Sequence, residues 1–458
     1  MEVVYNNDNF VFKRGNDMDL ETKVNALSKQ ISKMIQTGFW PGFVVGMYPS
    51  QFAYRPIKVD FNCWRKVREV NLYYHIPFCK WKCPYCTFFM TVHYDDEVAA
   101  RYIDKVNEQF NFINSYFEEP MVVKSICFGG GTPNSIPVDL YEKIFDTLRK
   151  ANVIFHEDLE PSMEVSPEIL DEPYIKRLAE IGIKRLSLGV QSLDKDLRKS
   201  INRKENLNIY DIVDILRKYN LNINFDVMYG LEGQTAESFM DTLKELVKLA
   251  PETFSLYPLA GSKTSMFKKK DSLMTTKERY QLFDVFYDYL TSNGYECESH
   301  VKFKKKNQHS THQQKIYEYQ GTPTLGLGCA ARSYNEHVHY TTEYTKNSLT
   351  ARKYIDEYIE KDYKDLQFCG FEMNEDENKR RTVIYAFFMG KLDPKIYFDK
   401  YGTDVWQDFH VELNALLQND LIVIKDNEIY LTRKGRKYTD LVGFIFWSEG
   451  VASMYAPI

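Results

Sequence analysis

The sequence lacks a long apolar run and a large excess of either charge. No stretch approaches the ~20 consecutive apolar residues of a membrane-spanning helix, so we expect no membrane segment. The 64 acidic and 59 basic residues leave a formal net charge of −5, which disfavours a protein that coats nucleic acid through bulk electrostatics. The first residues include Glu2 and Asp8 and no apolar signal region, so the sequence predicts a cytoplasmic location.

Short repeats and low-complexity tracts are also absent. The hydrophobic fraction of 44% supplies a sizeable core and excludes a globally disordered chain. At roughly 100–200 residues per domain, a chain of 458 residues holds several domains or one large barrel with additions.

Short β-rich runs alternate with amphipathic helical stretches over about residues 70–260. Six strand–helix alternations imply an α/β fold with a parallel sheet and right-handed crossovers, either open or rolled into a full or partial barrel. The predicted strands are 71–76, 123–128, 162–165, 185–190, 223–227 and 254–257, and the predicted helices are 97–116, 140–150, 168–181, 209–219 and 236–249.

The segments before this alternation differ in pattern. Apolar residues at helical spacing predict a helix over 20–35 that ends at Gly38. The stretch 39–56 is rich in aromatic residues and proline, so we interpret it as an extended arm.

After residue 262 the alternation fades, and the glycines of 326–328 indicate a turn. Beyond residue 372, helices precede a hairpin candidate with strands 421–425 and 428–431, which indicates a small winged-helix-like domain. We therefore expect four parts: an N-terminal helix and arm (1–65), a core barrel (66–270), a connecting region (271–370) and a C-terminal domain (371–458).

Three of the eight cysteines, Cys79, Cys83 and Cys86, lie within eight residues, directly after the first predicted strand of the alternation. Disulfides are rare in cytosolic proteins, and soft thiolates suit zinc or iron–sulfur clusters. A structural zinc site needs a fourth ligand, for which His75 is a candidate. Three thiolates on a four-iron cluster would leave one iron open for a ligand. The plainer alternative is three buried thiols that pack as small hydrophobes.

The segment from Tyr73 to Cys86, YYHIPFCKWKCPYC, resembles the cluster loop of radical S-adenosylmethionine (SAM) enzymes. More narrowly, it is similar to the HemN-like family, named for oxygen-independent coproporphyrinogen III oxidase, and the aromatic Tyr85 is part of that pattern. The resemblance implies that the three cysteines hold a [4Fe–4S] cluster and that SAM chelates its fourth iron. It also implies a partial (β/α)6 barrel with an N-terminal arm and a HemN-type C-terminal winged-helix-like domain.

Polar and glycine residues stand at the carboxyl ends of the other predicted strands, where parallel α/β folds bind ligands. Taken singly, the glycines of 129–131 could form a plain turn and Glu164 a surface ion pair. Together the marks follow the HemN-like pattern from about Tyr73 to Leu259. By this resemblance, Tyr73, Gly130 and Glu164 meet the cluster-bound SAM, and the residues around a second SAM or the substrate are Tyr85, Gly131, Thr132, Gln191, Arg203, Asp226, Pro258 and Arg332.

Two positions depart from the family pattern. Thr87-Phe88-Phe89 stands where coproporphyrinogen oxidases carry Gly-Cys-Asn after the third cysteine. Arg332 stands where the family often shows a small, apolar or histidine residue, although an arginine could bind a carboxylate such as a propionate. Both positions belong to the expected substrate site, so the sequence leaves the substrate open.

The resemblance implies a radical SAM oxidoreductase or methyltransferase. Such an enzyme cleaves SAM to a 5′-deoxyadenosyl radical, abstracts hydrogen, and oxidises, decarboxylates or methylates a tetrapyrrole or heteroaromatic substrate. It implies one or two SAM molecules and a reductant such as flavodoxin or ferredoxin. The alternatives are coproporphyrinogen III dehydrogenase proper, a haem-binding chaperone of the same fold, and a zinc-dependent structural or DNA-binding protein.

Overall fold

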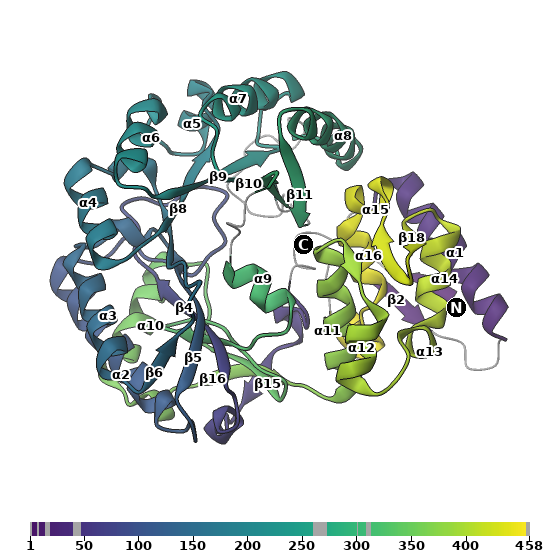
Figure 1. Cartoon of the computed structure of the whole chain (residues 1–458), viewed down its shortest axis with the longest axis horizontal. Coiled ribbons are helices and arrows are strands. Elements are labelled where there is room, and N and C mark those ends of the chain that lie inside the picture. The colour runs from purple at the N-terminus through teal and green to yellow at the C-terminus, as the bar shows by residue number, and fades with distance from the viewer. Residues whose placement is uncertain are drawn as a thin grey trace.

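The fold is described from a computed structural model, which shows an open ring of strands and helices beside a smaller, mostly helical unit (Figure 1). Within the described residues no helix is both long and apolar enough to cross a membrane. These residues are 2–6, 9–13, 19–39, 47–259, 273–299, 301–307 and 313–454.

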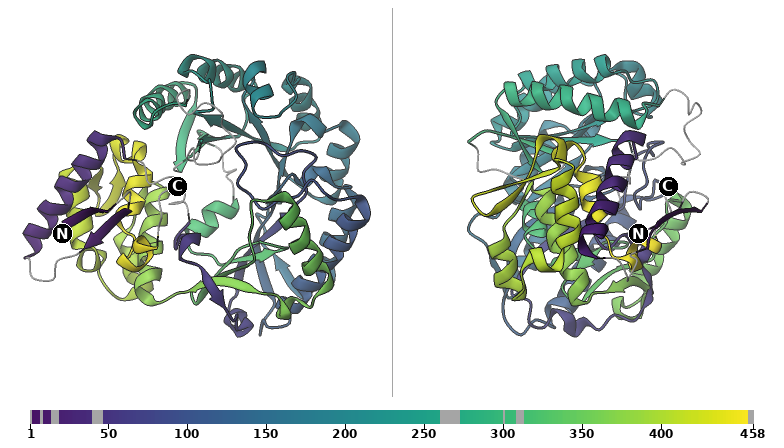
Figure 2. Two further views of the ribbon diagram at one scale, coloured as in Figure 1. Left: turned by 180° about the vertical axis from the view of Figure 1, so that it is seen from behind. Right: turned by 90° about the vertical axis from the view of Figure 1, so that its right-hand side faces the viewer.

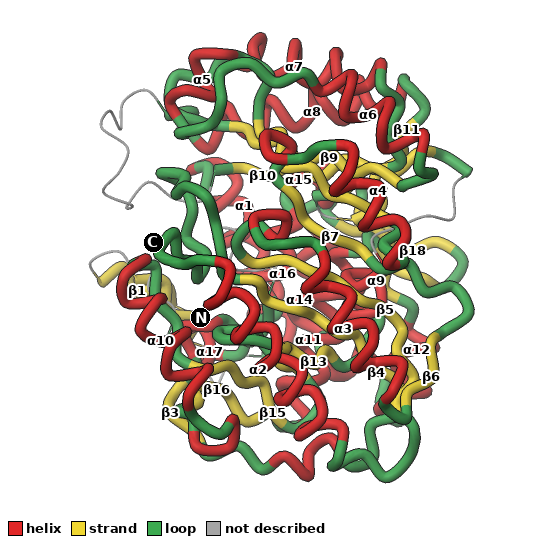
Figure 3. The backbone as a smooth tube through the Cα atoms, turned by 90° about the vertical axis from the view of Figure 1, so that its left-hand side faces the viewer, coloured by secondary structure: helices red, strands yellow, loops and turns green. Residues whose placement is uncertain are grey.

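The ring is built from the six predicted strands, which are confirmed and pair in parallel in the order β10-β9-β8-β7-β5-β4. The helices between them cover the outer face of the sheet (Figures 1 and 3). The strands are β4 (Glu69–Ile76), β5 (Met121–Gly130), β7 (Ser162–Val165), β8 (Arg185–Gln191), β9 (Asn222–Tyr229) and β10 (Thr253–Pro258), and the helices are α2 (Asp96–Asn114), α3 (Asp139–Lys150), α4 (Glu172–Ile181), α5 (Lys195–Ser200), α6 (Ile209–Lys218) and α7 (Ala236–Lys248).

The two faces of this sheet differ in polarity. Successive side chains of a strand point to opposite faces, and in β4 the buried Leu72 and Tyr74 belong to the apolar core under the helices. The alternate residue Asn71 is also buried, and its Oδ1 accepts a hydrogen bond of 2.7 Å from Ser125 Oγ. On β10, Thr253 Oγ1 likewise donates to Asn224 Oδ1 at 2.8 Å. The inner face of the ring is therefore a hydrogen-bonded polar lumen.

The sheet does not close into a complete barrel, so the partial-barrel prediction is confirmed. Beyond β10 it ends in an antiparallel hairpin of β12 (Lys302–Lys305) and β11 (Tyr295–Ser299). Beyond β4 it continues through five strands and ends at β3, which does not pair with β11. These five are β13 (Thr324–Leu327), β14 (Ser333–Tyr334), β15 (Val338–Thr342), β16 (Phe368–Glu372) and β3 (Arg55–Ile57).

Two local predictions were wrong at this second end. Gly326 lies within β13, parallel to β4, and only Gly328 belongs to the turn. A Cβ on Gly326 would come within 2.4 Å of the carbonyl oxygen of Arg332, so the glycine serves close backbone packing inside a strand. The expected irregular arm contains the edge strand β3, paired with β16; residues 40–46 of that arm lie outside the described part.

The smaller unit combines both ends of the chain. Helix α1 (Leu20–Thr37) ends at Gly38 as predicted, with φ of 69°. It shares an apolar core with the C-terminal helices, and Ser32 Oγ donates to Asn419 Oδ1 at 2.7 Å (Figure 2). The predicted hairpin is present as β18 (Ile422–Lys425) and β19 (Glu428–Leu431). The remaining elements are β1 (Glu2–Asn6), β2 (Asn9–Lys13), α11 (Glu375–Phe388), β17 (Lys391–Leu392), α12 (Pro394–Tyr401), α13 (Val405–Asp408), α14 (His410–Gln418), α15 (Arg433–Lys437), α16 (Thr439–Ile445) and α17 (Glu449–Ser453).

Three helices belong to the connecting region. Helix α8 (Thr276–Ser292) packs on β11, and α10 (Ser348–Glu360) packs on α2. The short helix α9 (Gln313–Tyr319) lies in the middle of the ring, where it contacts β4 and β5 on one side and α11 on the other (Figure 1). The polar lumen is thereby partly filled from within.

Candidate functional site

The three-cysteine loop follows the carboxyl end of β4. Cys79 and Cys83 are buried and Cys86 is partly buried. The amide of Cys79 donates to the carbonyl oxygen of Thr91 at 3.0 Å, and Asn202 Nδ2 donates to the carbonyl oxygen of Lys82 at 3.0 Å. Burial raises the pKa of Cys79 to about 12 and that of Cys86 to about 11. Both would remain thiols at neutral pH unless a bound cationic centre stabilised the thiolates.

The arrangement fits a cluster better than a single metal ion. Among the described residues, no three His, Cys, Asp or Glu side chains converge closely enough to hold one ion. A four-iron cluster does not require such convergence, because each thiolate binds a different iron. His75 is held by contacts at both ring nitrogens: its Nε2 donates to the carbonyl oxygen of Phe89 at 2.9 Å, and its Nδ1 lies 3.3 Å from the hydroxyl of Tyr73. His75 is not grouped with the three cysteines in the described residues, so the structure gives the zinc interpretation no support.

The glycine turn after β5 is hydrogen-bonded to this loop. Gly130 has φ of +107°, which favours glycine. A Cβ on Gly131 would lie 2.7 Å from the carbonyl oxygen of Phe78, so only glycine lets the two backbones approach. Thr132 donates its amide to the same carbonyl at 2.7 Å, and its Oγ1 lies 3.3 Å from Cys79 Sγ. The turn holds the first cysteine in place.

Two carboxyl groups face the lumen near the glycine turn. Glu164 Oε2 accepts a long hydrogen bond of 3.4 Å from the amide of Gly130. Burial, followed by the charge of Asp226, raises the pKa of Glu164 to about 7. Asp226 Oδ1 accepts from Asn224 Nδ2 at 2.8 Å, and burial raises its pKa to about 6. Burial, followed by the charge of the nearby Glu164, raises the pKa of Tyr73. Such shifted carboxyl groups are typical of functional sites.

The end of β8 is irregular at Gln191. Its φ of 63° lies in the left-handed region, and the register with β9 shifts between Gly189 and Gln191. A bulge of this kind re-aims a side chain at the rim of a barrel. Arg203 lies beside it and donates through Nη1 to the carbonyl oxygen of Gly189 at 3.2 Å.

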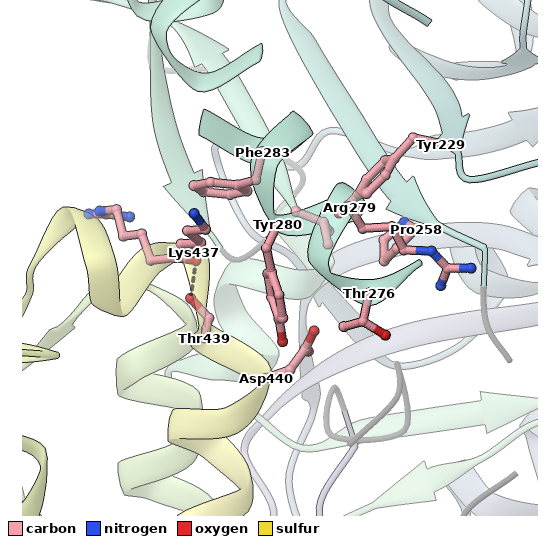
Figure 4. Close-up of a pocket in the computed structure, with 11 residues that line it drawn as sticks. Tyr229, Pro258, Thr276, Arg279, Tyr280, Phe283, Lys437, Thr439 and Asp440 are labelled. Atoms are coloured by element: carbon pink, nitrogen blue, oxygen red, sulfur yellow. Dashed lines mark hydrogen bonds between the residues drawn. The ribbon is translucent and has the colours of Figure 1, made fainter. Parts of the chain in front are cut away.

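Tyr85 and Pro258 mark the apolar part of the rim. Tyr85 packs against the small cluster of Ile201, Met228, Leu231 and Leu259. Pro258 lines a cavity of about 30 Å³ at the seam between the barrel and the smaller unit. In Figure 4 this cavity lies between Tyr280 on α8 and Asp440 on α16, with Arg279 beside Pro258.

Arg332 connects the arm to the segment after the third cysteine. Its guanidinium bonds to Met47 Sδ and to Gln51 Oε1, and it lies over the ring of Tyr344 at 5.6 Å. The hydroxyl of Tyr344 donates to the carbonyl oxygen of Thr87 at 2.5 Å. Tyr344 therefore contacts both positions that depart from the family pattern, Arg332 and the segment that begins at Thr87.

The sequence analysis missed a buried charge cluster behind the rim. Glu168 accepts from Arg198 Nη2 at 2.5 Å and from Arg203 Nη1 at 3.0 Å. It was expected to begin a helix, but it lies in a 3-10 turn and α4 begins at Glu172. Neighbouring residues mark the true start of α4. Asp171 is its N-cap, whose side chain accepts a hydrogen bond from the amide of Tyr174, and a proline lies in the first turn.

Comparisons with known proteins agree with this arrangement. Residues 73–246 match the model of the Radical SAM superfamily. Oxygen-independent coproporphyrinogen III oxidase of Salmonella typhimurium is 27% identical over 389 residues, which cover 81% of this chain and 83% of that protein. Heme chaperone HemW of Haemophilus influenzae is 24% identical over 399 residues, which cover 84% of this chain and 99% of that protein.

The fold also has a solved counterpart. The structure of coproporphyrinogen III oxidase (HemN) from Escherichia coli matches with a TM-score of 0.71 at 24% identity, over 84% of this chain and 92% of that one. The cofactors of the radical SAM superfamily are a [4Fe–4S] cluster and SAM, and the three-cysteine loop fits them. In its superfamily match and its relatives, the chain is similar to the HemN-like radical SAM proteins, and it shares their fold.

Proposed function

We propose that the chain is a HemN-like radical SAM enzyme that acts on a tetrapyrrole or heteroaromatic substrate. When bound, the cluster and SAM supply reductive cleavage of SAM and abstraction of a hydrogen atom from the substrate. The observation that carries the proposal is the joining of three elements: the cysteine loop, the glycine turn bonded to it, and the buried carboxyl groups of Glu164 and Asp226 in a polar lumen. The reductant would be a small electron carrier such as flavodoxin or ferredoxin.

The chain's own residues would divide the work of binding and enclosure. Cys79, Cys83 and Cys86 would hold the cluster, and Tyr73, Gly130 and Glu164 would orient the SAM bound to it. The arm, fastened to Arg332 through Gln51, would keep water from the site. A second SAM or the substrate would meet Tyr85, Gly131, Thr132, Gln191, Arg203, Asp226, Pro258 and Arg332.

The outcome of the reaction separates the finer alternatives. Coproporphyrinogen III oxidation is supported by the oxidase relatives. Haem carriage without catalysis is supported by the match to nearly the whole length of a HemW chaperone. Methyl transfer would need a second SAM in the same lumen.

The test is anaerobic. The protein is reconstituted with iron and sulfide, mixed with dithionite and SAM, and assayed for 5′-deoxyadenosine and S-adenosylhomocysteine. We expect the wild-type protein to form 5′-deoxyadenosine and the Cys83→Ala variant to form none. The matched control is Cys369→Ala, which changes a cysteine of β16 outside the loop and should still form the product. S-adenosylhomocysteine beside it would indicate methyl transfer. A fully loaded cluster that gives neither product, together with stoichiometric haem binding, would overturn the enzyme proposal in favour of a carrier.

A further inference from the structure

A lysine of the edge hairpin points into the lumen. Lys302 lies on β12 opposite Ser255 of β10, and its neighbour Phe303 packs outward against Phe286 and Tyr287 of α8. Because side chains alternate along a strand, Lys302 takes the inner face. Only 5% of the residue is exposed. Figure 1 shows β11, the outer strand of this hairpin, at the open edge of the sheet, and β12 lies between β11 and β10.

The ammonium group lies near the carboxyl groups of Glu298 and Asp226 but is hydrogen-bonded to neither. Lys302 Nζ makes no hydrogen bond within the described part of the protein, and neither carboxylate oxygen of the buried Glu298 does. The nearest cation recorded for Glu298 is Lys304 Nζ, at 4.0 Å, too long for a hydrogen bond. An unsatisfied buried polar group destabilises the folded state, more so if it is charged, so native folds rarely keep one without a use.

The surroundings show which ligand chemistry this ammonium suits. In register across β9, β10 and β12, Asp226, Ser255 and Lys302 form one layer of the lumen wall. Ser255 donates its hydroxyl to Asn224 Oδ1 at 3.1 Å, and Asp226 accepts from Asn224 Nδ2 at 2.8 Å. Neither Ser255 nor Asp226 accepts a hydrogen bond from Lys302. The other lysine near these carboxyl groups, Lys315, is paired with Glu318 at 2.9 Å. Lys302 is thus a lumen-facing ammonium that makes no hydrogen bond within the described residues, so all three of its donors can serve a ligand.

We propose that Lys302 binds a carboxylate of the small molecule held in the lumen and so determines which ligands the site accepts. This inference rests on the proposed function and names the substrate class: a molecule with a carboxylate side chain. The carboxylate could also be that of the methionine part of SAM, and the experiment separates the two sources. Burial lowers the pKa of Lys302 to about 8, so the group is still mostly cationic at neutral pH.

Equilibrium binding to the reconstituted protein under anaerobic conditions tests this. The probes are SAM, coproporphyrin III and the tetramethyl ester of coproporphyrin III. If the substrate supplies the carboxylate, Lys302→Met weakens coproporphyrin III binding roughly 10- to 100-fold and leaves binding of SAM and of the ester unchanged. If SAM supplies it, the same loss falls on SAM. Unchanged SAM affinity, with coproporphyrin III binding absent or unaffected, would overturn the inference.

Stability separates recognition from a structural role. Methionine is about as long as lysine and removes a buried unpaired charge, so we expect Lys302→Met to unfold at the same temperature as the parent or higher. A lower unfolding temperature with unchanged affinities would show that Lys302 only neutralises Asp226 and Glu298. The matched control is Lys305→Met, on the outer face of the same strand, where Nζ donates to the carbonyl oxygen of Ala250.

Failure of this inference is distinguishable from failure of the proposed function. Coproporphyrin III binding that depends on Lys302, in a protein that cleaves no SAM, would keep the carboxylate site and discard the radical chemistry. SAM cleavage by a protein whose coproporphyrin III binding does not depend on Lys302 would keep the radical chemistry and discard the carboxylate site.

Discussion

The barrel contains two groups of buried charges. The charges of one group are hydrogen-bonded to one another, and those of the other make no hydrogen bond within the described part of the chain. Behind the rim, Glu168 is fully enclosed and bonded to Arg198 and Arg203, and Arg198 also donates to the carbonyl oxygens of Val190 and Ser192 at 2.9 Å. In the lumen, Lys302 and Glu298 have no hydrogen-bond partner among the described residues.

The pKa directions follow the same division. Burial alone would raise the pKa of Glu168, but Arg203 and the Ser166 hydroxyl hold it below its usual value. Burial raises the pKa of Glu164 with no guanidinium near enough to reverse it. A charge cluster completed within the protein braces the strand ends, whereas an incomplete one is prepared for a ligand. The substitutions below test this division, beginning with the largest effect.

Glu168→Gln should cause the largest loss of stability. The change keeps the side-chain shape but leaves two buried guanidinium groups without their carboxylate, which costs about 3–5 kcal/mol in free energy of unfolding. Urea unfolding measures it. The control is Glu172→Gln, which breaks the exposed pair with Lys218 and should cost far less. Equal losses in the two variants would contradict the division.

Glu164→Gln should change how stability depends on pH. The pKa of Glu164 is raised to about 7 in the folded protein, so the folded state retains this proton up to a higher pH than the unfolded state. The wild type therefore loses stability as pH rises from about 5 to about 8, and the glutamine variant does not share that loss, which amounts to roughly 2–3 kcal/mol. Urea unfolding at both pH values checks this. Parallel pH profiles would show that the carboxyl group is not held protonated by burial.

Lys304→Met should have the smallest effect. Lys304 lies on the same face of β12 as Lys302, but it is partly exposed and pairs with Glu296 at 3.4 Å. Its loss should change the free energy of unfolding by less than about 1 kcal/mol and leave ligand affinity unchanged. A loss of affinity equal to that of Lys302→Met would mean that the hairpin acts through its overall charge and not through one ammonium group.

Much of the barrel and part of the site could be predicted from neighbouring residues. The six strands follow from runs of apolar and β-branched residues, and Gly38 ends α1 because it can adopt the left-handed conformation. The cysteine spacing and Tyr85 indicate the cluster loop before any coordinate is known. Each of these features depends on residues that are close together in the sequence, so the local sequence pattern is enough to predict it.

The rest depends on residues that are far apart in the chain. The pairing of β13 with β4 joins residues about 250 positions apart, and the shared core of α1 and α14 joins the two ends of the chain. The contacts of both His75 ring nitrogens, with Tyr73 and with Phe89, likewise become visible only in the folded protein.

The sequence by itself determined the alternation of strands and helices, the three-cysteine loop and the order of polar residues at the strand ends. Only the tertiary structure decided which buried charges are paired. Lys302 and Glu168 are both ordinary charged residues in the sequence. Glu168 is paired with two arginines, whereas Lys302 has no hydrogen-bond partner in the described residues. The difference arises because long-range packing determines the neighbours of each side chain.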